Sequence, residues 1–140
     1  MAGPRSFLLL PLLLLALAFA VQAERLPRLL GGLMEANENE EGVQKALGFA
    51  LREFNKASND MYHSRVSRVV RVRKQIVSGV KYYIEAELGR TTCTKSMANL
   101  ESCPYHEDPT LQKHSVCEFV VYTVPWLGKT TLLKNECKDA

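Results

Sequence analysis

The spacing of apolar residues between positions 40 and 56 predicts an amphipathic helix. Six apolar side chains fall at offsets 0, 3, 4, 7, 8 and 11, which is one face of a helix. Asn37 or Asn39 can cap its first turn. Gly42 and Gly48 each weaken it by about 1 kcal/mol relative to Ala, so we expect packing against a sheet to hold it. The apolar face consists of Val43, Ala46, Leu47, Ala50, Leu51 and Phe54.

Alternation of apolar and charged residues from Ser67 to Leu88 predicts a half-buried β-hairpin. Most of the apolar side chains stand at even positions and most of the charged ones at odd positions. The register that brings apolar residues together, and opposite charges together, leaves Val77–Gly79 as the turn. It pairs Val72 with Ile84, Val70 with Ala86 and Arg71 with Glu85.

A second hairpin is predicted between residues 114 and 137, where two alternating segments flank the sequence PWLGK. Residues 92–113, between the hairpins, are rich in Asn, Pro, Asp and charge, so we expect an irregular excursion. A turn centred on Leu127 pairs Val121 with Leu133 and Cys117 with Cys137. The cysteine pair predicts a disulfide across neighbouring strands.

One helix followed by at least four antiparallel strands predicts an α+β domain, with a twisted sheet wrapped across the helix. The segment before the helix has a different residue pattern. Residues 24–33 contain Pro27 and the pair Gly31 and Gly32, and they show no periodicity. We expect this segment to form an extended, flexible arm.

The first 23 residues have the pattern of a secretory signal peptide. Arg5 precedes an apolar run from Phe7 to Val21, and small residues end the segment at Ala23. The run is 15 residues long, shorter than the roughly 20 that cross a bilayer. We therefore expect cleavage after Ala23, which gives a secreted, extracellular domain of residues 24–140 without a membrane partner.

Charge and cysteine content bear on the partners of the protein and on its disulfides. Without the signal peptide, 17 Lys and Arg residues stand against 15 Asp and Glu residues, too mild a surplus to indicate nucleic acid as a partner. All four cysteines lie in the second half of a chain directed to an oxidising compartment, so we expect two disulfides. Of the three possible pairings, spacing favours Cys93 with Cys103 and Cys117 with Cys137.

Residues that could perform catalysis are sparse. The chain contains no Gly-x-Ser-x-Gly, no His-Glu-x-x-His and no phosphate-binding loop. His63, His106 and His114 are scattered over predicted loops and a strand edge, so we interpret each as an ordinary surface residue. Oxidised cysteines are neither nucleophiles nor zinc ligands. We expect no enzymatic activity, no metal and no cofactor.

The basic run from Arg65 to Lys74 offers one alternative function. Such a run could bind heparin, a membrane surface or nucleic acid. The predicted pairing of Arg71 with Glu85, with Glu87 on the same face, balances much of the charge. A module that binds polyanions or acts against microbes is therefore kept as an alternative function.

Three apolar features are predicted to be exposed: Leu29–Gly32 on the arm, Gln75–Gly79 at the first turn, and Pro125 with Trp126 at the second. Exposed apolar clusters mark binding surfaces. Taken singly, each feature has an ordinary explanation, since Trp126 could cover the core and Gly79 could complete a tight turn. Two hairpin tips of one sheet can lie at the same end, where the arm could join them. Together they predict a composite interface.

These segments resemble the secreted type 2 cystatins. The resemblance runs from RLLGG through FNKASND, QIVSG and VPWLG to the final ECKDA. Gln-x-Val-x-Gly alone is a weak pattern, but the upstream glycine, the downstream Pro-Trp and four cysteines at these spacings make the match specific. It implies a five-stranded sheet around one long helix, and a reversible, tight-binding inhibitor of papain-like cysteine proteases such as cathepsins B, H, L and S.

In that family, the arm and the two turns form a wedge that fills the active-site cleft of the protease. Carried onto this chain, the resemblance implies that Leu29 and Leu30 enter apolar pockets on the substrate side of the cleft. Gly32 would bend the arm away from the catalytic thiol. The implied wedge comprises Leu29, Leu30, Gly31, Gly32, Gln75, Ile76, Val77, Ser78, Gly79, Pro125 and Trp126.

A second inhibitory site is suggested by the sequence KASNDMY. Some type 2 cystatins inhibit legumain, which cleaves after Asn, by presenting an Asn in this loop. The matching residues here are Ser58, Asn59 and Asp60. The alternative is a turn that ends the helix, where Asn and Asp suit the backbone geometry.

Val77 bears on the oligomeric state. A β-branched residue at a tight turn is strained if its φ is positive. Opening of that turn could allow domain swapping into dimers that hide the wedge. We therefore expect a monomer, with a domain-swapped dimer as the alternative state.

Overall fold

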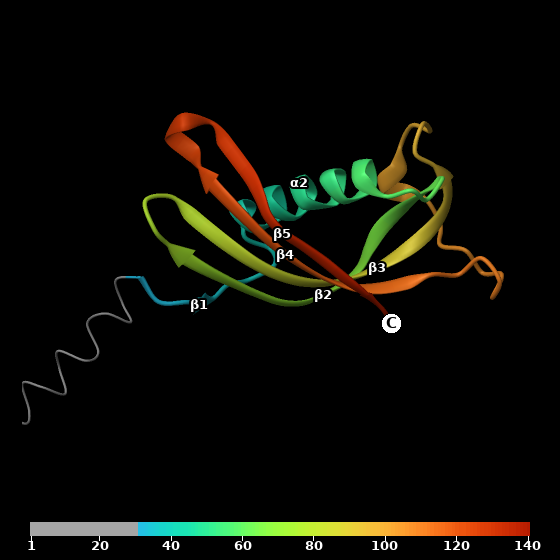
Figure 1. The fold of residues 1–140 in the computed structure, drawn as a ribbon, viewed down its shortest axis with the longest axis horizontal. Helices are drawn as coiled ribbons and strands as arrows, with labels where there is room; N and C mark the ends of the chain where they lie inside the picture. Colours follow the sequence, from blue (N-terminus) through green and yellow to red (C-terminus); the bar gives the residue numbers. More distant parts are fainter. Residues whose placement is uncertain (1–30) are drawn as a thin grey trace, which may run out of the picture. The chain divides into compact units, whose positions relative to one another are not determined.

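The computed structural model describes residues 31–140, of which Met34–Ala140 form one compact unit. This unit is an antiparallel five-stranded sheet with strand order β1-β2-β3-β4-β5 and one α-helix, α2 (Figure 1). The predicted α+β class is confirmed. The elements are β1 (Met34–Glu35), α2 (Glu41–Ala57), β2 (Tyr62–Ile76), β3 (Val80–Thr94), β4 (His114–Val124) and β5 (Lys129–Asp139), with 3₁₀ turns η1 (Leu100–Ser102) and η2 (Pro125–Leu127).

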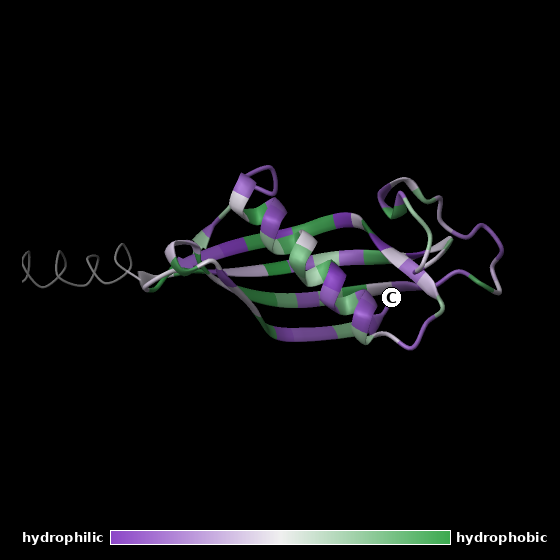
Figure 2. Cartoon of the chain, turned by 90° about the horizontal axis from the view of Figure 1, so that it is seen from above, coloured by the Kyte–Doolittle hydropathy of each residue, from purple (hydrophilic) through white to green (hydrophobic). Residues whose placement is uncertain are grey.

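The helix lies across one face of the sheet, and this contact forms the core (Figure 2). The predicted apolar face of α2 is the one that packs inward, with Leu51 and Phe54 partly buried at its edge. Phe54 contacts Phe119 of β4 edge-to-face, with ring centroids 6.4 Å apart. Full burial of an aromatic side chain such as Phe119 contributes about 2–3 kcal/mol. The buried helix residues Val43, Ala46, Leu47 and Ala50 meet Ile84, Ala86, Leu88, Phe119 and Val121.

The first turn of α2 differs from the prediction. Its N-cap residue is Glu40, without a side-chain capping hydrogen bond. The Asn37 side chain instead accepts a hydrogen bond from the Asn39 backbone N–H, 2.8 Å away. The predicted cap by Asn37 or Asn39 was therefore wrong, because the Asn37 side chain closes the preceding turn instead.

The first hairpin keeps most of its predicted register. Val72 pairs with Ile84 and Arg71 with Glu85, as expected, and residues 77–79 form the turn. The predicted pair of Val70 with Ala86 was wrong. A β-bulge between Val69 and Arg71 pairs Val69 with Ala86 and leaves Val70 40% exposed, because the extra residue turns out of the ladder.

The second hairpin shows the same kind of departure. Cys117 pairs with Cys137 as predicted, but Val121 pairs with Leu132 and not with Leu133. A register shift next to Val120 accounts for the difference. Leu132 packs against the core and Leu133 is 52% exposed.

Two disulfides fix the second half of the chain. Cys93 is bonded to Cys103 and Cys117 to Cys137, which confirms both predicted pairings. The first disulfide closes the start of the irregular excursion, which begins after Thr94 and not at Thr92, because β3 continues to that residue. Among the helices of residues 31–140, none has the length and apolar character needed to cross a membrane.

Candidate functional site

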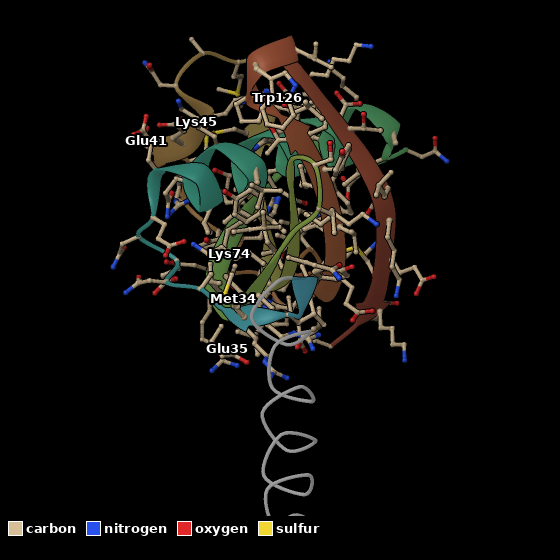
Figure 3. All side chains as sticks on the ribbon, turned by 90° about the vertical axis from the view of Figure 1, so that its left-hand side faces the viewer. Met34, Glu35, Glu41, Lys45, Lys74 and Trp126 are labelled. Atoms are coloured by element: carbon tan, nitrogen blue, oxygen red, sulfur yellow. A yellow bond between two sulfur atoms is a disulfide. The ribbon has the colours of Figure 1, made fainter. Side chains whose placement is uncertain are left out.

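The tips of the two hairpins lie at the same end of the sheet (Figure 1). The pairing of Val80 with Thr123 sets the β2–β3 turn beside the end of β4, where η2 begins. Figure 3 looks onto this end, with Trp126 of η2 at its top. Ile76 is 56% exposed and Trp126 is 67% exposed. The structure thus brings together the two hairpin-borne apolar features that the sequence predicted to be exposed.

A tyrosine that the sequence analysis missed ties these tips together. The Tyr122 hydroxyl donates a hydrogen bond to the Ser78 backbone oxygen, 2.6 Å away. A Cβ at Gly79 would lie 2.8 Å from the Thr123 backbone oxygen, so only glycine allows this approach. The signal for Tyr122 lay in the alternation of β4, which gives it a face opposite to that of the core residue Val121. The relative position of the two tips is therefore set before any partner binds.

Backbone strain in the β2–β3 turn does not fall on the predicted residue. The Val77 N–H donates to the Gly79 carbonyl oxygen at 3.0 Å, which closes the turn. The positive φ angles fall on Ser78 (36°) and Gly79 (121°), and Val77 has none. The predicted strain at Val77 was therefore wrong, because the turn adopts left-handed geometry one residue later, at a residue without β-branching.

The η2 turn presents Trp126 to solvent. Pro125 stands at its first position, where a missing N–H costs nothing. Gly128 ends the turn with φ 61° and donates its N–H to the Pro125 oxygen at 3.1 Å. The exposure of Trp126 rules out the alternative in which this side chain covers the core.

The arm is only partly described. Leu29 and Leu30 lie outside the described residues, and Gly31 and Gly32 belong to the unit that precedes Met34. Met34 pairs with Lys74, two residues before Ile76 at the end of β2. The contribution of the arm to the composite interface stays a prediction.

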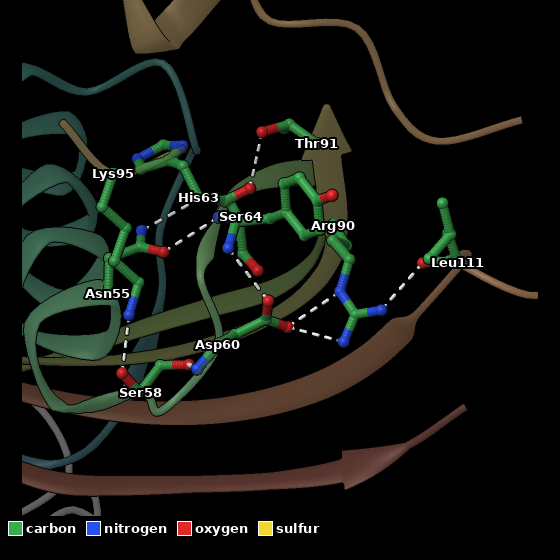
Figure 4. A network of polar contacts seen from close by, with 10 residues as sticks. Asn55, Ser58, Asp60, His63, Ser64, Arg90, Thr91, Lys95 and Leu111 are labelled. Atoms are coloured by element: carbon green, nitrogen blue, oxygen red, sulfur yellow. Dashed lines mark hydrogen bonds and ion pairs between the residues drawn. The ribbon is translucent and has the colours of Figure 1, made fainter. Parts of the chain in front are cut away.

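The loop after α2 exposes Asn59 and holds its neighbours. Ser58 and Asp60 are half-buried, whereas Asn59 and Met61 are exposed. Such alternation is typical of an extended segment, the form in which protease clefts bind peptides. The Asp60 carboxylate forms an ion pair with Arg90 at 2.6 Å (Figure 4). Burial raises the pKa of Asp60, but hydrogen bonds from the Tyr62 backbone N–H and from Arg90 outweigh it, so the pKa is lowered.

The basic run from Arg65 to Lys74 is largely neutralised by neighbours. Its members form three ion pairs, a hydrogen bond to the Cys103 carbonyl oxygen and a stacking contact over the Tyr105 ring. Glu35 of β1, and not Glu85 as the register suggested, is the ion-pair partner of Arg71. The contacts argue against an open polyanion-binding stripe. The ion pairs are Arg68 with Glu87, Arg71 with Glu35, and Lys74 with Glu40.

The histidines are less ordinary than predicted. His114 is exposed, but His106 is buried and meets the Tyr62 ring edge-to-face, 4.6 Å between centroids. His63 is half-buried, and its Nδ1 atom is buried without a hydrogen-bond partner in the described chain. The expectation of a surface position was wrong for His106 because the disulfide-closed excursion folds back over β3 at the Thr91–Tyr105 bridge.

The cystatin domain model matches residues 31–126. The chain belongs to the cystatin family. Cystatin-C of Macaca mulatta is 56% identical and cystatin-C of Homo sapiens 54% identical, and each alignment covers all of both chains. Cystatin-C of Bos taurus is 62% identical over 86% of this chain and 81% of its own length.

Solved structures agree with this assignment. Dimeric human cystatin F superposes with a TM-score of 0.71 and 34% identity, over 79% of this chain and 88% of its own. The structure titled Al-CPI gives a TM-score of 0.68 at 25% identity, over 79% of this chain and 100% of its own. The chain is a type 2 cystatin close to cystatin C, as the sequence indicated. It is therefore a cysteine protease inhibitor of the cystatin family.

Proposed function

We propose that this cystatin inhibits papain-like cysteine proteases, among them cathepsins B, H, L and S, by filling their active-site cleft with a wedge. The wedge consists of the arm residues 29–32, the turn residues 75–79, and Pro125 with Trp126. The observation that carries the proposal is the exposed Trp126 beside a β2–β3 turn that Tyr122 holds in place.

The proposed mechanism is occlusion without chemistry. A protease cleft that receives Ile76 and Trp126 buries two apolar side chains that the free inhibitor leaves in water. Because the hydrogen bond from Tyr122 already orders the turn, little conformational entropy is lost on binding. Leu29 and Leu30 would add apolar contacts on the substrate side of the cleft.

Titration of papain and cathepsin L with the oxidised protein, together with Trp126→Ala, tests the wedge. We expect tight, reversible inhibition, with Trp126→Ala dissociating about 30-fold faster, since loss of a buried aromatic anchor costs about 2 kcal/mol. Met97→Ala, which removes an exposed apolar side chain from the excursion, is the matched control and should keep the rate of the unmodified protein. Equal dissociation rates for all three proteins would sink the wedge.

Truncation of the arm probes the third part of the wedge. Removal of residues up to Gly31 should also speed dissociation from cathepsin L, because the apolar contacts of Leu29 and Leu30 are lost. Stopped-flow or surface-binding measurements separate the two rate constants. An unchanged dissociation rate would remove the arm from the wedge.

The loop of Ser58, Asn59 and Asp60 supports a second proposed site, which inhibits legumain. Legumain cleaves after Asn, and Asn59 is exposed while the residues on either side of it are half-buried. Asn59→Lys should abolish inhibition of legumain and leave inhibition of papain intact. Asn135→Lys places the same charge on exposed β5 and serves as the control. Loss of both activities in Asn59→Lys would contradict two separate sites.

Secretion and oligomeric state belong to the same proposal. Two disulfides in the described chain suit an oxidising compartment, and cleavage after Ala23 would leave residues 24–140 as a single domain. Intact-mass measurement of the protein released by expressing cells should give a chain that begins at Glu24. We further propose a monomer that can exchange its β1–α2–β2 segment with a second copy when the β2–β3 turn opens.

A further inference from the structure

Two cations, one in β3 and one just after it, reach the residues on either side of Asn59 (Figure 4). Lys95 donates from Nζ to the Ser58 carbonyl oxygen at 2.6 Å. Arg90 donates from Nε to the Asp60 carboxylate at 2.8 Å. The residue before Asn59 and the residue after it are thus each held by a side chain more than 25 positions away in the sequence.

The contacts of Asp60 leave its carboxylate no freedom to turn. One oxygen accepts from Arg90 and the other from the Tyr62 backbone N–H at 3.0 Å. The Asp60 backbone N–H donates to the Ser58 hydroxyl at 3.1 Å. The Arg90 and Asp60 side chains are 21% and 14% exposed, so water weakens their attraction less than at an open surface.

Both ends of the loop are anchored as well. Asn55, near the end of α2, is buried and exchanges two hydrogen bonds with the Ser64 backbone of β2, at 2.9 and 3.1 Å. Arg90 donates from Nη1 to the Leu111 carbonyl oxygen at 2.9 Å, which ties the same guanidinium to the excursion. In contrast, the Asn59 side chain makes no hydrogen bond within residues 31–140. The loop therefore has a fixed backbone around one unengaged side chain.

We propose that Arg90 and Lys95 are positioning residues that hold the loop in the shape in which Asn59 enters the legumain cleft. This inference rests on the proposed legumain site. Fixing the backbone of one residue costs about 1–2 kcal/mol of conformational entropy. A loop that is ordered beforehand does not lose this free energy on binding, so each cation strengthens binding by roughly tenfold.

The contact between Arg90 and Asp60 does not require neutral pH. Because the pKa of Asp60 is lowered, its carboxylate stays ionised well below neutral pH, and the contact with Arg90 persists there. The lysine contact goes to a carbonyl oxygen, which does not titrate in this range. The contact between Arg90 and Asp60 therefore remains when the solution is mildly acidic.

The test compares inhibition constants for legumain and papain across two pairs of variants. Arg90→Gln and Lys95→Met should each weaken inhibition of legumain about tenfold and leave papain unaffected. Lys95→Arg should restore the affinity, and Arg90→Lys, which keeps the charge without the planar fork, should recover part of it. Arg68→Gln removes an exposed ion pair elsewhere on the sheet and should change neither constant.

Hydrogen exchange at the Asp60 and Tyr62 amides reports on the loop without any protease. In Arg90→Gln these amides should exchange at least about tenfold faster than in the unmodified protein. Unchanged exchange, or a parallel loss of papain inhibition, would overturn the local role. If Asn59→Lys abolishes legumain inhibition while Arg90→Gln and Lys95→Met keep it, only the positioning role fails. If the unmodified protein does not inhibit legumain, both proposals fall.

Discussion

Ser78 carries the strain at the tip of the β2–β3 turn, with φ 36°. A residue with a Cβ in this left-handed region costs roughly 1–2 kcal/mol, and Asn tolerates the region better than Ser. We therefore expect Ser78→Asn to raise the free energy of unfolding by up to about 1 kcal/mol, measured by urea denaturation. Because the turn must open for domain swapping, the same variant should yield fewer dimers after partial denaturation, measured by size-exclusion chromatography.

Val77→Asn is the matched control at the neighbouring position. Val77 has no positive φ, so Asn relieves no strain there and should not stabilise the monomer. The Tyr122 hydrogen bond goes to the backbone of the turn, so neither substitution removes it. If Val77→Asn stabilised the protein as much as Ser78→Asn, the strain would not lie where the backbone angles place it.

Substitution of the two glycines of α2 distinguishes the effect of helix propensity on stability from the effect of packing. A Cβ at Gly42 would collide with the Tyr82 hydroxyl, whereas a Cβ at Gly48 meets only the Arg52 guanidinium at 3.6 Å. Gly48→Ala should therefore stabilise the protein by about 1 kcal/mol through helix propensity alone. Gly42→Ala should destabilise it by about 1 kcal/mol, because the buried Tyr82 side chain must shift to make room and this overpacking outweighs the same gain. Thermal unfolding of both variants measures the difference.

A second substitution checks the cause of the Gly42 effect. Tyr82→Phe removes the hydroxyl that the new Cβ would meet. The cost of Gly42→Ala should shrink when Tyr82 is already Phe, which a double-mutant cycle detects as coupling. Additive effects of the two substitutions would show that the clash is not the cause.

Sequence periodicity predicted the helix and all four long strands but not the bulges. Period-2 alternation reports which face a residue occupies only while the ladder is regular. One of the three register shifts of the first hairpin lies at the pair Val69 and Val70, and the register shift of the second lies opposite Leu132 and Leu133. Because both members of each pair are apolar, the sequence does not reveal which of them faces the core.

The candidate site was predictable in part. Residues whose exposure follows from local pattern were predicted, and residues that act on partners far away in the sequence were not. Ile76 and Trp126 stand at hairpin tips, so local pattern was enough to expect them at the surface. The residues that hold the surfaces together were missed: Tyr122, Arg90 and Lys95 act on partners 44, 30 and 37 positions away. The alternation of β4 indicates which face Tyr122 occupies, but the contact partners of all three residues depend on tertiary structure that no local pattern encodes.

At the scale of the whole domain, the lowered pKa of His63 leads us to expect a loss of stability in acid. Burial lowers the pKa of His63, and the positive charges of Lys95 and Arg65 lower it further. The unfolded chain titrates near the usual value of about 6.5. As pH falls below that value, the unfolded state binds a proton that the folded state resists, so the free energy of unfolding decreases.

His63→Gln removes this titration while keeping a polar side chain of similar size. Its urea midpoint should therefore fall less than that of the unmodified protein between pH 7.5 and the onset of carboxylate titration near about pH 5. The two proteins should differ most at the acidic end of this range. Papain inhibition at pH 7 should be equal, because His63 lies outside the proposed wedge. Parallel midpoint curves would show that His63 does not couple folding to pH.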